Sequence, residues 1–165
     1  MNQNCVVVAG GSRARFFSLQ DPQVPEMESG PNLVELSDLV NPEKDARQRD
    51  LWSETKSGRN RSPAAGAAHG YDDHREQHED EFERRFARSV AEECLRLAQS
   101  HGTRNVVLVA QKRMLGFLRT TLDPVFKAGV EIQELAKDLS KLPPKELHEH
   151  LAREGLLPRR RSPTV

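Results

Sequence analysis

Residues 105–110 read Asn-Val-Val-Leu-Val-Ala, and every residue after the asparagine is apolar. A strand with one face in solvent alternates polar and apolar residues, whereas a strand covered on both faces is apolar throughout. The run therefore predicts a central strand of a sheet with a packed layer on each side.

The segments on either side of this strand have helical periodicity. From Asp72 to about Gln99, apolar residues recur at spacings of three and four, which marks one buried helix face. The first turns of this segment are polar, so we expect them to project beyond the core, and Gly102 should end the helix. The second helix follows the strand, with inward positions Met114, Leu115, Leu118 and Leu122 and with Pro124 near its end.

The amino-terminal part of the chain predicts a β-hairpin. Residues 5–9 form a short run rich in valine, and residues 13–19 resume an extended pattern after Gly10-Gly11-Ser12. Two strands separated by such a turn are typical of a hairpin. Arg13 and Arg15 alternate with apolar neighbours, so we place both on the solvent face of the second strand.

Three more elements complete the pattern. Residues 32–36 predict a third strand in which Val34 and Leu36 alternate with polar neighbours, and residues 130–135 predict the last strand. Pro143-Pro144 opens a short helix, because proline is favoured at the first helical positions. The apolar residues of that helix are Leu147 and Leu151.

The element order is strand, strand, strand, helix, strand, helix, strand, helix. It predicts an α/β fold: a mixed sheet with a three-stranded antiparallel meander followed by two β/α crossover units, as in ribonuclease-H-like sheets. We expect a single domain over residues 1–158, with a polar insert at 41–71 and a basic tail at 159–165.

Composition excludes several classes of function. The chain has 165 residues, 30% of them charged, and a formal net charge of zero, so no global field draws it to a polyanion. No apolar run is long enough to cross a bilayer, and the first residues lack the pattern of a signal peptide. Cys5 and Cys94 are too few for a disulfide framework. We therefore expect a cytoplasmic protein with no membrane partner.

Spaced blocks of residues resemble the bacterial host attachment protein family over nearly the whole chain. The blocks are residues 6–17, Pro42-Glu43, Arg47, Arg49, Asp50-Leu51, Gly58-Arg59, Phe82, Phe86-Ala87, Leu115-Gly116, Leu118-Arg119 and Lys137-Asp138-Leu139. Gly10 departs from the aspartate that the family commonly has there. By strand order, the family resembles the middle domain of eukaryotic and archaeal class-one release factors. In that domain a loop before the long helix carries a Gly-Gly-Gln tripeptide that triggers peptidyl-tRNA hydrolysis.

This resemblance implies that the loop from Lys56 to Tyr71 is the functional element, although no glutamine lies between Gln48 and Gln77. Glycines there allow positive φ and close approach to RNA, and basic side chains could hold phosphates. The candidate binding residues are Lys56, Arg59, Arg61, Gly66, His69 and Gly70. We predict a non-catalytic module that binds RNA or the ribosome. The alternatives are a hydrolase of peptidyl-tRNA or a related ester, with the backbone or His69 replacing the glutamine, and a protein-interaction factor needed indirectly for attachment.

Other chemistry finds little support in the sequence. A two-metal nuclease needs carboxylates at strand ends, but the first strand has none and residues 110–112 read Ala-Gln-Lys. His74 and His78 lie four residues apart and are weak zinc candidates without a third ligand. We expect no metal, cofactor or catalytic residue. The run Arg159-Arg160-Arg161 is interpreted as solvated, or as a weak contribution to RNA affinity.

Overall fold

The computed structural model describes residues 3–41, 68–123 and 129–163. They form a single mixed α/β domain, as the sequence predicts. The elements in chain order are β1 (Asn4–Ala9), β2 (Arg13–Gln20), β3 (Asn32–Val40), α2 (Ala68–His101), β4 (Asn105–Ala110), α3 (Lys112–Leu122), β5 (Glu131–Ala136) and α4 (Pro144–Arg153).

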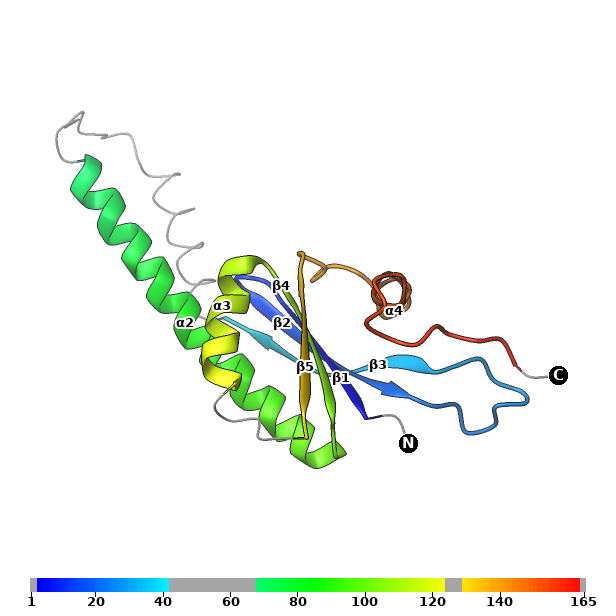
Figure 1. The fold of residues 1–165 in the computed structure, drawn as a ribbon. Coiled ribbons are helices and arrows are strands. Elements are labelled where there is room, and N and C mark those ends of the chain that lie inside the picture. The colour runs from blue at the N-terminus through cyan, green and yellow to red at the C-terminus, as the bar shows by residue number, and fades with distance from the viewer. Residues whose placement is uncertain (1–2, 42–67, 124–128, 164–165) are drawn as a thin grey trace.

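The five strands form one sheet in the order β3-β2-β1-β4-β5 (Figure 1). The pairs β1–β2 and β2–β3 are antiparallel, whereas β1–β4 and β4–β5 are parallel. The antiparallel meander and the two crossover strands of the prediction are therefore confirmed.

Helices cover the sheet on both faces, and two hydrophobic clusters result. Val7, Phe16 and Leu108 pack with α2 and α3 on one face. On the other face, Phe17 and Val107 pack with α4. Every residue of β4 after Asn105 is buried, because successive side chains of the central strand enter opposite clusters.

The predicted third strand is confirmed as β3, and it contains a β-bulge. Phe16 pairs with Ser37 but Phe17 pairs with Glu35, so Leu36 is the extra residue. The buried residue of β3 is Leu33, which joins the cluster under α4, while Val34 points to the other face and remains 37% exposed. A pattern of strict alternation could not show this shift.

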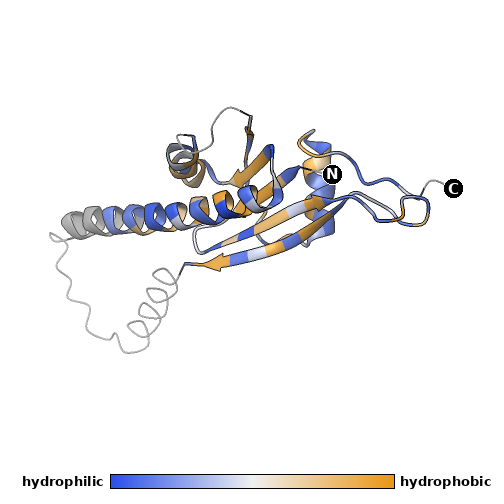
Figure 2. Cartoon of the chain, turned by 90° about the horizontal axis from the view of Figure 1, so that it is seen from below, coloured by the Kyte–Doolittle hydropathy of each residue, from blue (hydrophilic) through white to orange (hydrophobic). Residues whose placement is uncertain are grey.

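Helix α2 is longer than the sheet it packs on. Its 34 residues span about 50 Å at the ~1.5 Å rise of an α-helix. Among the residues of α2 whose side chains are described, the first buried one is Phe86, and the turns before it extend past the sheet, as predicted. Figure 1 shows this extension, and in Figure 2 the coloured turns beyond the sheet are mostly hydrophilic. The helix ends at His101 before Gly102, whose φ of +59° favours glycine.

No helix in residues 3–41, 68–123 and 129–163 has both the length and the apolar character that a bilayer-spanning helix requires.

Candidate functional site

Most of the predicted loop residues lie outside the part of the chain that the structure describes: Lys56, Arg59, Arg61 and Gly66. The backbone of His69 and Gly70 is described, and it belongs to the first turn of α2, which begins at Ala68 instead of Asp72. The alanines before His69 are strong helix formers, and one glycine costs a helix only about 1 kcal/mol. Gly70 therefore lies in a helix and not in the loop where the sequence placed it.

The two zinc candidates, His74 and His78, both lie on α2. The His78 ring is exposed and stacks on Phe82, with ring centroids 6.2 Å apart. Among the described residues, no three side chains of the metal-binding types come together.

The base of the projecting half of α2 is clamped to α3. Arg113, in the first turn of α3, forms ion pairs with Asp80 and Glu83 of α2, and its Nε lies 3.3 Å from the Glu83 Oε2. One residue further along α2, the Arg84 guanidinium lies 5.4 Å from the centre of the Phe117 ring of α3. These contacts precede Phe86, where the buried face of α2 begins. They therefore hold the projecting half in a defined direction.

A small cavity of about 170 Å³ lies beside this clamp, at the carboxyl ends of β1 and β4. In open α/β sheets this edge is the usual place for ligands. Its two carboxylates are engaged within the protein: Glu83 pairs with Arg113, and the Asp138 Oδ1 accepts hydrogen bonds from the Ser140 N–H and Oγ–H. The full lining is Ala9, Gly10, Gly11, Glu83, Gln111, Arg113, Met114 and Asp138.

The sequence analysis did not identify these two carboxylates. Asp138 follows the parallel strand β5, so its position after the predicted last strand was a signal for this edge of the sheet. Glu83 comes from α2, and only the packing of that helix brings it here, so the sequence holds no signal for it.

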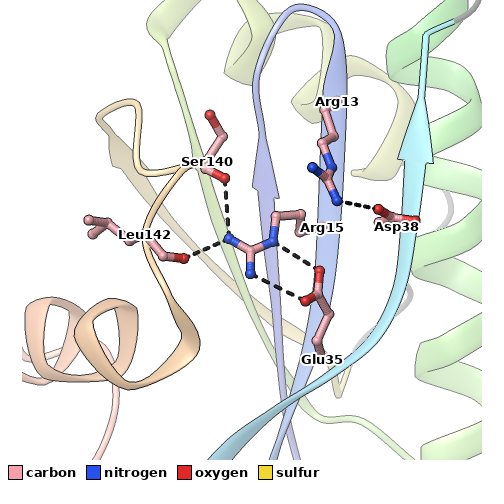
Figure 3. A network of polar contacts seen from close by, with 6 residues as sticks. All are labelled: Arg13, Arg15, Glu35, Asp38, Ser140 and Leu142. Carbon is pink, nitrogen blue, oxygen red and sulfur yellow. Dashed lines mark hydrogen bonds and ion pairs between the residues drawn. The ribbon is translucent and has the colours of Figure 1, made fainter.

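Arg15 forms a network that the sequence did not predict (Figure 3). Its Nε and one terminal nitrogen donate to the two oxygens of Glu35, at 2.9 and 3.2 Å. The other terminal nitrogen donates to the carbonyls of Ser140 and Leu142, at 3.2 and 2.6 Å. Arg15 therefore joins β2, β3 and the segment between β5 and α4.

The prediction of a solvent-facing side chain holds for Arg13 and is wrong for Arg15. The Arg13 side chain is 55% exposed and pairs with Asp38. The Arg15 side chain lies on the same face but is only 11% exposed. The difference arises because the segment from Ser140 to Leu142 covers that part of the sheet and supplies two of the hydrogen bonds.

The two cysteines meet in the core between β1 and α2, and both are free thiols. The hydrogen bond to Cys5 and burial raise the pKa of the Cys94 thiol. The same hydrogen bond lowers the pKa of Cys5, but that residue is 2% exposed. Because a reactive cysteine needs both thiolate character and access, neither residue is placed to act as a nucleophile.

Comparison with known families gives one match. Residues 5–151 match the model of a family described as "Protein required for attachment to host cells". The chain belongs to this family. The matched range ends at Leu151 in α4 and does not include the arginine-rich segment that follows. No curated protein matches the chain.

Proposed function

We propose that this host attachment family protein is a cytosolic, non-catalytic module that binds the phosphate backbone of RNA, free or within the ribosome, through the insert at residues 41–71. The observation that carries the proposal is the projecting half of α2. The insert runs into this helix, since its last residues, 68–71, form the first turn of α2, and the ion pairs of Arg113 link the helix to α3 further along. The helix therefore acts as a rigid support for the insert.

The chemistry of the insert suits an anionic, bulky ligand. Lys56, Arg59 and Arg61 supply cationic groups for phosphates, and such contacts position a nucleic acid without reading its sequence. Gly66 and Gly70 lack a side chain, and His69 lies between them in the sequence, so this stretch adds little bulk between the insert and a ligand. A large folded RNA can approach a projecting support of this kind without colliding with the sheet.

The family description concerns attachment to host cells. Because the proposed ligand is intracellular, we attribute the attachment role to an indirect effect, exerted through the products of RNAs or ribosomes that the protein binds.

The decisive experiment compares RNA binding and ribosome co-sedimentation of the wild type with Arg59→Ala/Arg61→Ala at two salt concentrations. Losing two phosphate contacts should weaken binding on the order of tenfold and reduce the log–log salt slope by about 1.4. The control is Arg104→Ala/Arg119→Ala, which removes the same charge from exposed positions outside the insert. Equal affinities for the wild type and the insert variant would overturn the proposal.

A second arm of the experiment tests the non-catalytic part of the proposal. Purified peptidyl-tRNA is incubated with the wild type and with His69→Ala, and release of the peptide is measured. We expect no release above the uncatalysed rate from either protein. Turnover by the wild type that disappears in His69→Ala would replace the binding module with a hydrolase.

A further inference from the structure

The segment that follows α4 is docked on the body of the protein at three points. Arg161 and Gly30 exchange two backbone hydrogen bonds, Arg161 N–H to the Gly30 carbonyl at 2.8 Å and Gly30 N–H to the Arg161 carbonyl at 3.0 Å. The Arg160 Nε donates to the Asn32 Oδ1 at 2.8 Å. The third point is at Pro158, ahead of the arginines.

That third point is a buried histidine of α4. His148 is 3% exposed, and its Nε2 lies 2.8 Å from the Pro158 carbonyl. Because a carbonyl only accepts, the Nε2 carries the hydrogen of this bond. Together the three contacts hold residues 158–161 in one conformation, so the arginine run is not a free tail.

A groove of about 420 Å³ lies between α4 and this docked segment. Its cationic residues come from both sides: Lys145 and Arg153 from α4, and Arg159, Arg160 and Arg161 from the segment. Glu149 is the single carboxylate that lines it. The groove lies on the sheet face opposite α2 and α3, because α4 packs in the other hydrophobic cluster.

The groove has an excess of positive charge, with five cationic side chains against the single carboxylate of Glu149. In the described part of the chain, none of them forms an ion pair. Several arginines elsewhere are paired with carboxylates, including Arg13 with Asp38 and Arg119 with Glu134. Uncompensated cations along a concave surface raise the local concentration of an anionic ligand.

We propose that this groove, defined by Lys145, Arg153 and Arg159 to Arg161, binds the phosphodiester backbone of single-stranded RNA. The guanidinium fork matches phosphate oxygens, and docking of the segment lowers the ordering cost of binding. The lining contains no Phe, Tyr or Trp, and its one aromatic ring, that of His148, is 3% exposed and bonded to the Pro158 carbonyl. Phosphate contacts therefore dominate, and such contacts carry no sequence information. The site is separate from the insert and does not rest on the role proposed for it.

The test uses the full chain and a labelled, mixed-sequence single-stranded RNA in fluorescence anisotropy. Arg159→Gln/Arg161→Gln and Lys145→Gln/Arg153→Gln should each weaken binding on the order of tenfold and lower the log–log salt slope by about 1.4. The matched control is Arg13→Gln/Arg96→Gln, which removes two exposed arginines that are paired with carboxylates. Its affinity should stay within about twofold of the wild type, since those cations are already compensated.

Three further measurements separate the possible outcomes. Polyuridylate should bind as tightly as mixed-sequence RNA, unfolding curves should show that the groove variants fold like the wild type, and binding to phosphatidylglycerol vesicles is measured beside binding to RNA.

Two outcomes would overturn the proposal. One is wild-type affinity for RNA in both groove variants, and the other is binding to the vesicles without binding to RNA. The insert variant Arg59→Ala/Arg61→Ala is measured in parallel, so that failure of the insert and failure of the groove are seen independently.

Discussion

Arginines of this protein fall into two groups that differ in whether the protein itself supplies their hydrogen-bond and ion-pair partners. Where β2 and α3 meet their neighbours, Arg15 is saturated by Glu35 and two carbonyls, and Arg113 is paired with Asp80 and Glu83. In the groove beside α4, the cationic side chains have no carboxylate within ion-pair distance among the described residues. The comparison teaches that an arginine used for support is satisfied by the protein, whereas an arginine available for a ligand is not.

The largest effect on stability should come from Arg15→Met. The change leaves Glu35 and the carbonyls of Ser140 and Leu142 without their donors in a largely buried place. Glu35 keeps about a third of its side chain in solvent, so we expect a loss of about 2–4 kcal/mol in unfolding free energy instead of the full cost of a buried pair. Chemical denaturation measures it. Arg13→Met is the control and should cost less than about 1 kcal/mol; equal losses would erase the distinction between the two arginines.

A smaller effect is expected from Arg113→Met, which removes the clamp at the base of α2. Because Arg113 is about half exposed, the unfolding free energy should fall by no more than about 1 kcal/mol. The local effect should be clearer: amide hydrogens of residues 77–85 should exchange faster, because the projecting helix loses its link to α3. Arg119→Met breaks an exposed pair with Glu134 and serves as the control. Unchanged exchange in that part of α2 would show that the ion pairs do not hold the support.

The pH dependence of stability should reveal the Glu93–Arg96 pair on α2. The hydrogen bond from Arg96 lowers the pKa of Glu93 below its usual range. The Glu93 carboxylate therefore takes up a proton more readily in the unfolded state than in the folded state. The pair stabilises the protein fully at pH values above the usual glutamate pKa of about 4.3. This contribution to the unfolding free energy is lost as the pH falls through the lowered pKa of the folded state. The wild type should be more stable than Glu93→Gln at neutral pH, and the difference should vanish in acid. Glu92→Gln, which removes a carboxylate at an exposed neighbouring position, is measured as the control.

The smallest effect on stability should come from Arg159→Gln/Arg161→Gln. The backbone bonds between Arg161 and Gly30 do not need the side chain, and neither arginine is neutralised by a carboxylate in the described structure. The unfolding free energy should stay within about 0.5 kcal/mol of the wild type in the same denaturation assay. A loss of unfolding free energy as large as that of Arg15→Met would show that Arg159 and Arg161 stabilise the fold. The argument that they are available to a ligand would then fail.

The candidate sites show how far sequence patterns reach. The run of three arginines is visible in the sequence, but the groove is not, because Lys145 and Arg153 come from α4 and the partner of Arg161 is Gly30. Likewise, the alternation of β2 places Arg13 and Arg15 on the same face, yet only the structure shows that the segment after β5 covers one of them. Such contacts join residues that are far apart in the chain, so no local pattern records them.

By itself, the sequence determined the elements and their order. Apolar runs specified β1 and β4, spacings of three and four specified the buried half of α2 and the inner face of α3, and Gly102 marked the end of a helix. These features are local, since they depend on backbone preference and on which side chains avoid water. Only the tertiary structure decided the bulge in β3, the burial of Arg15 and the docking of the C-terminal arginines. Each of these depends on which segments meet, and that is set by the packing of the whole chain.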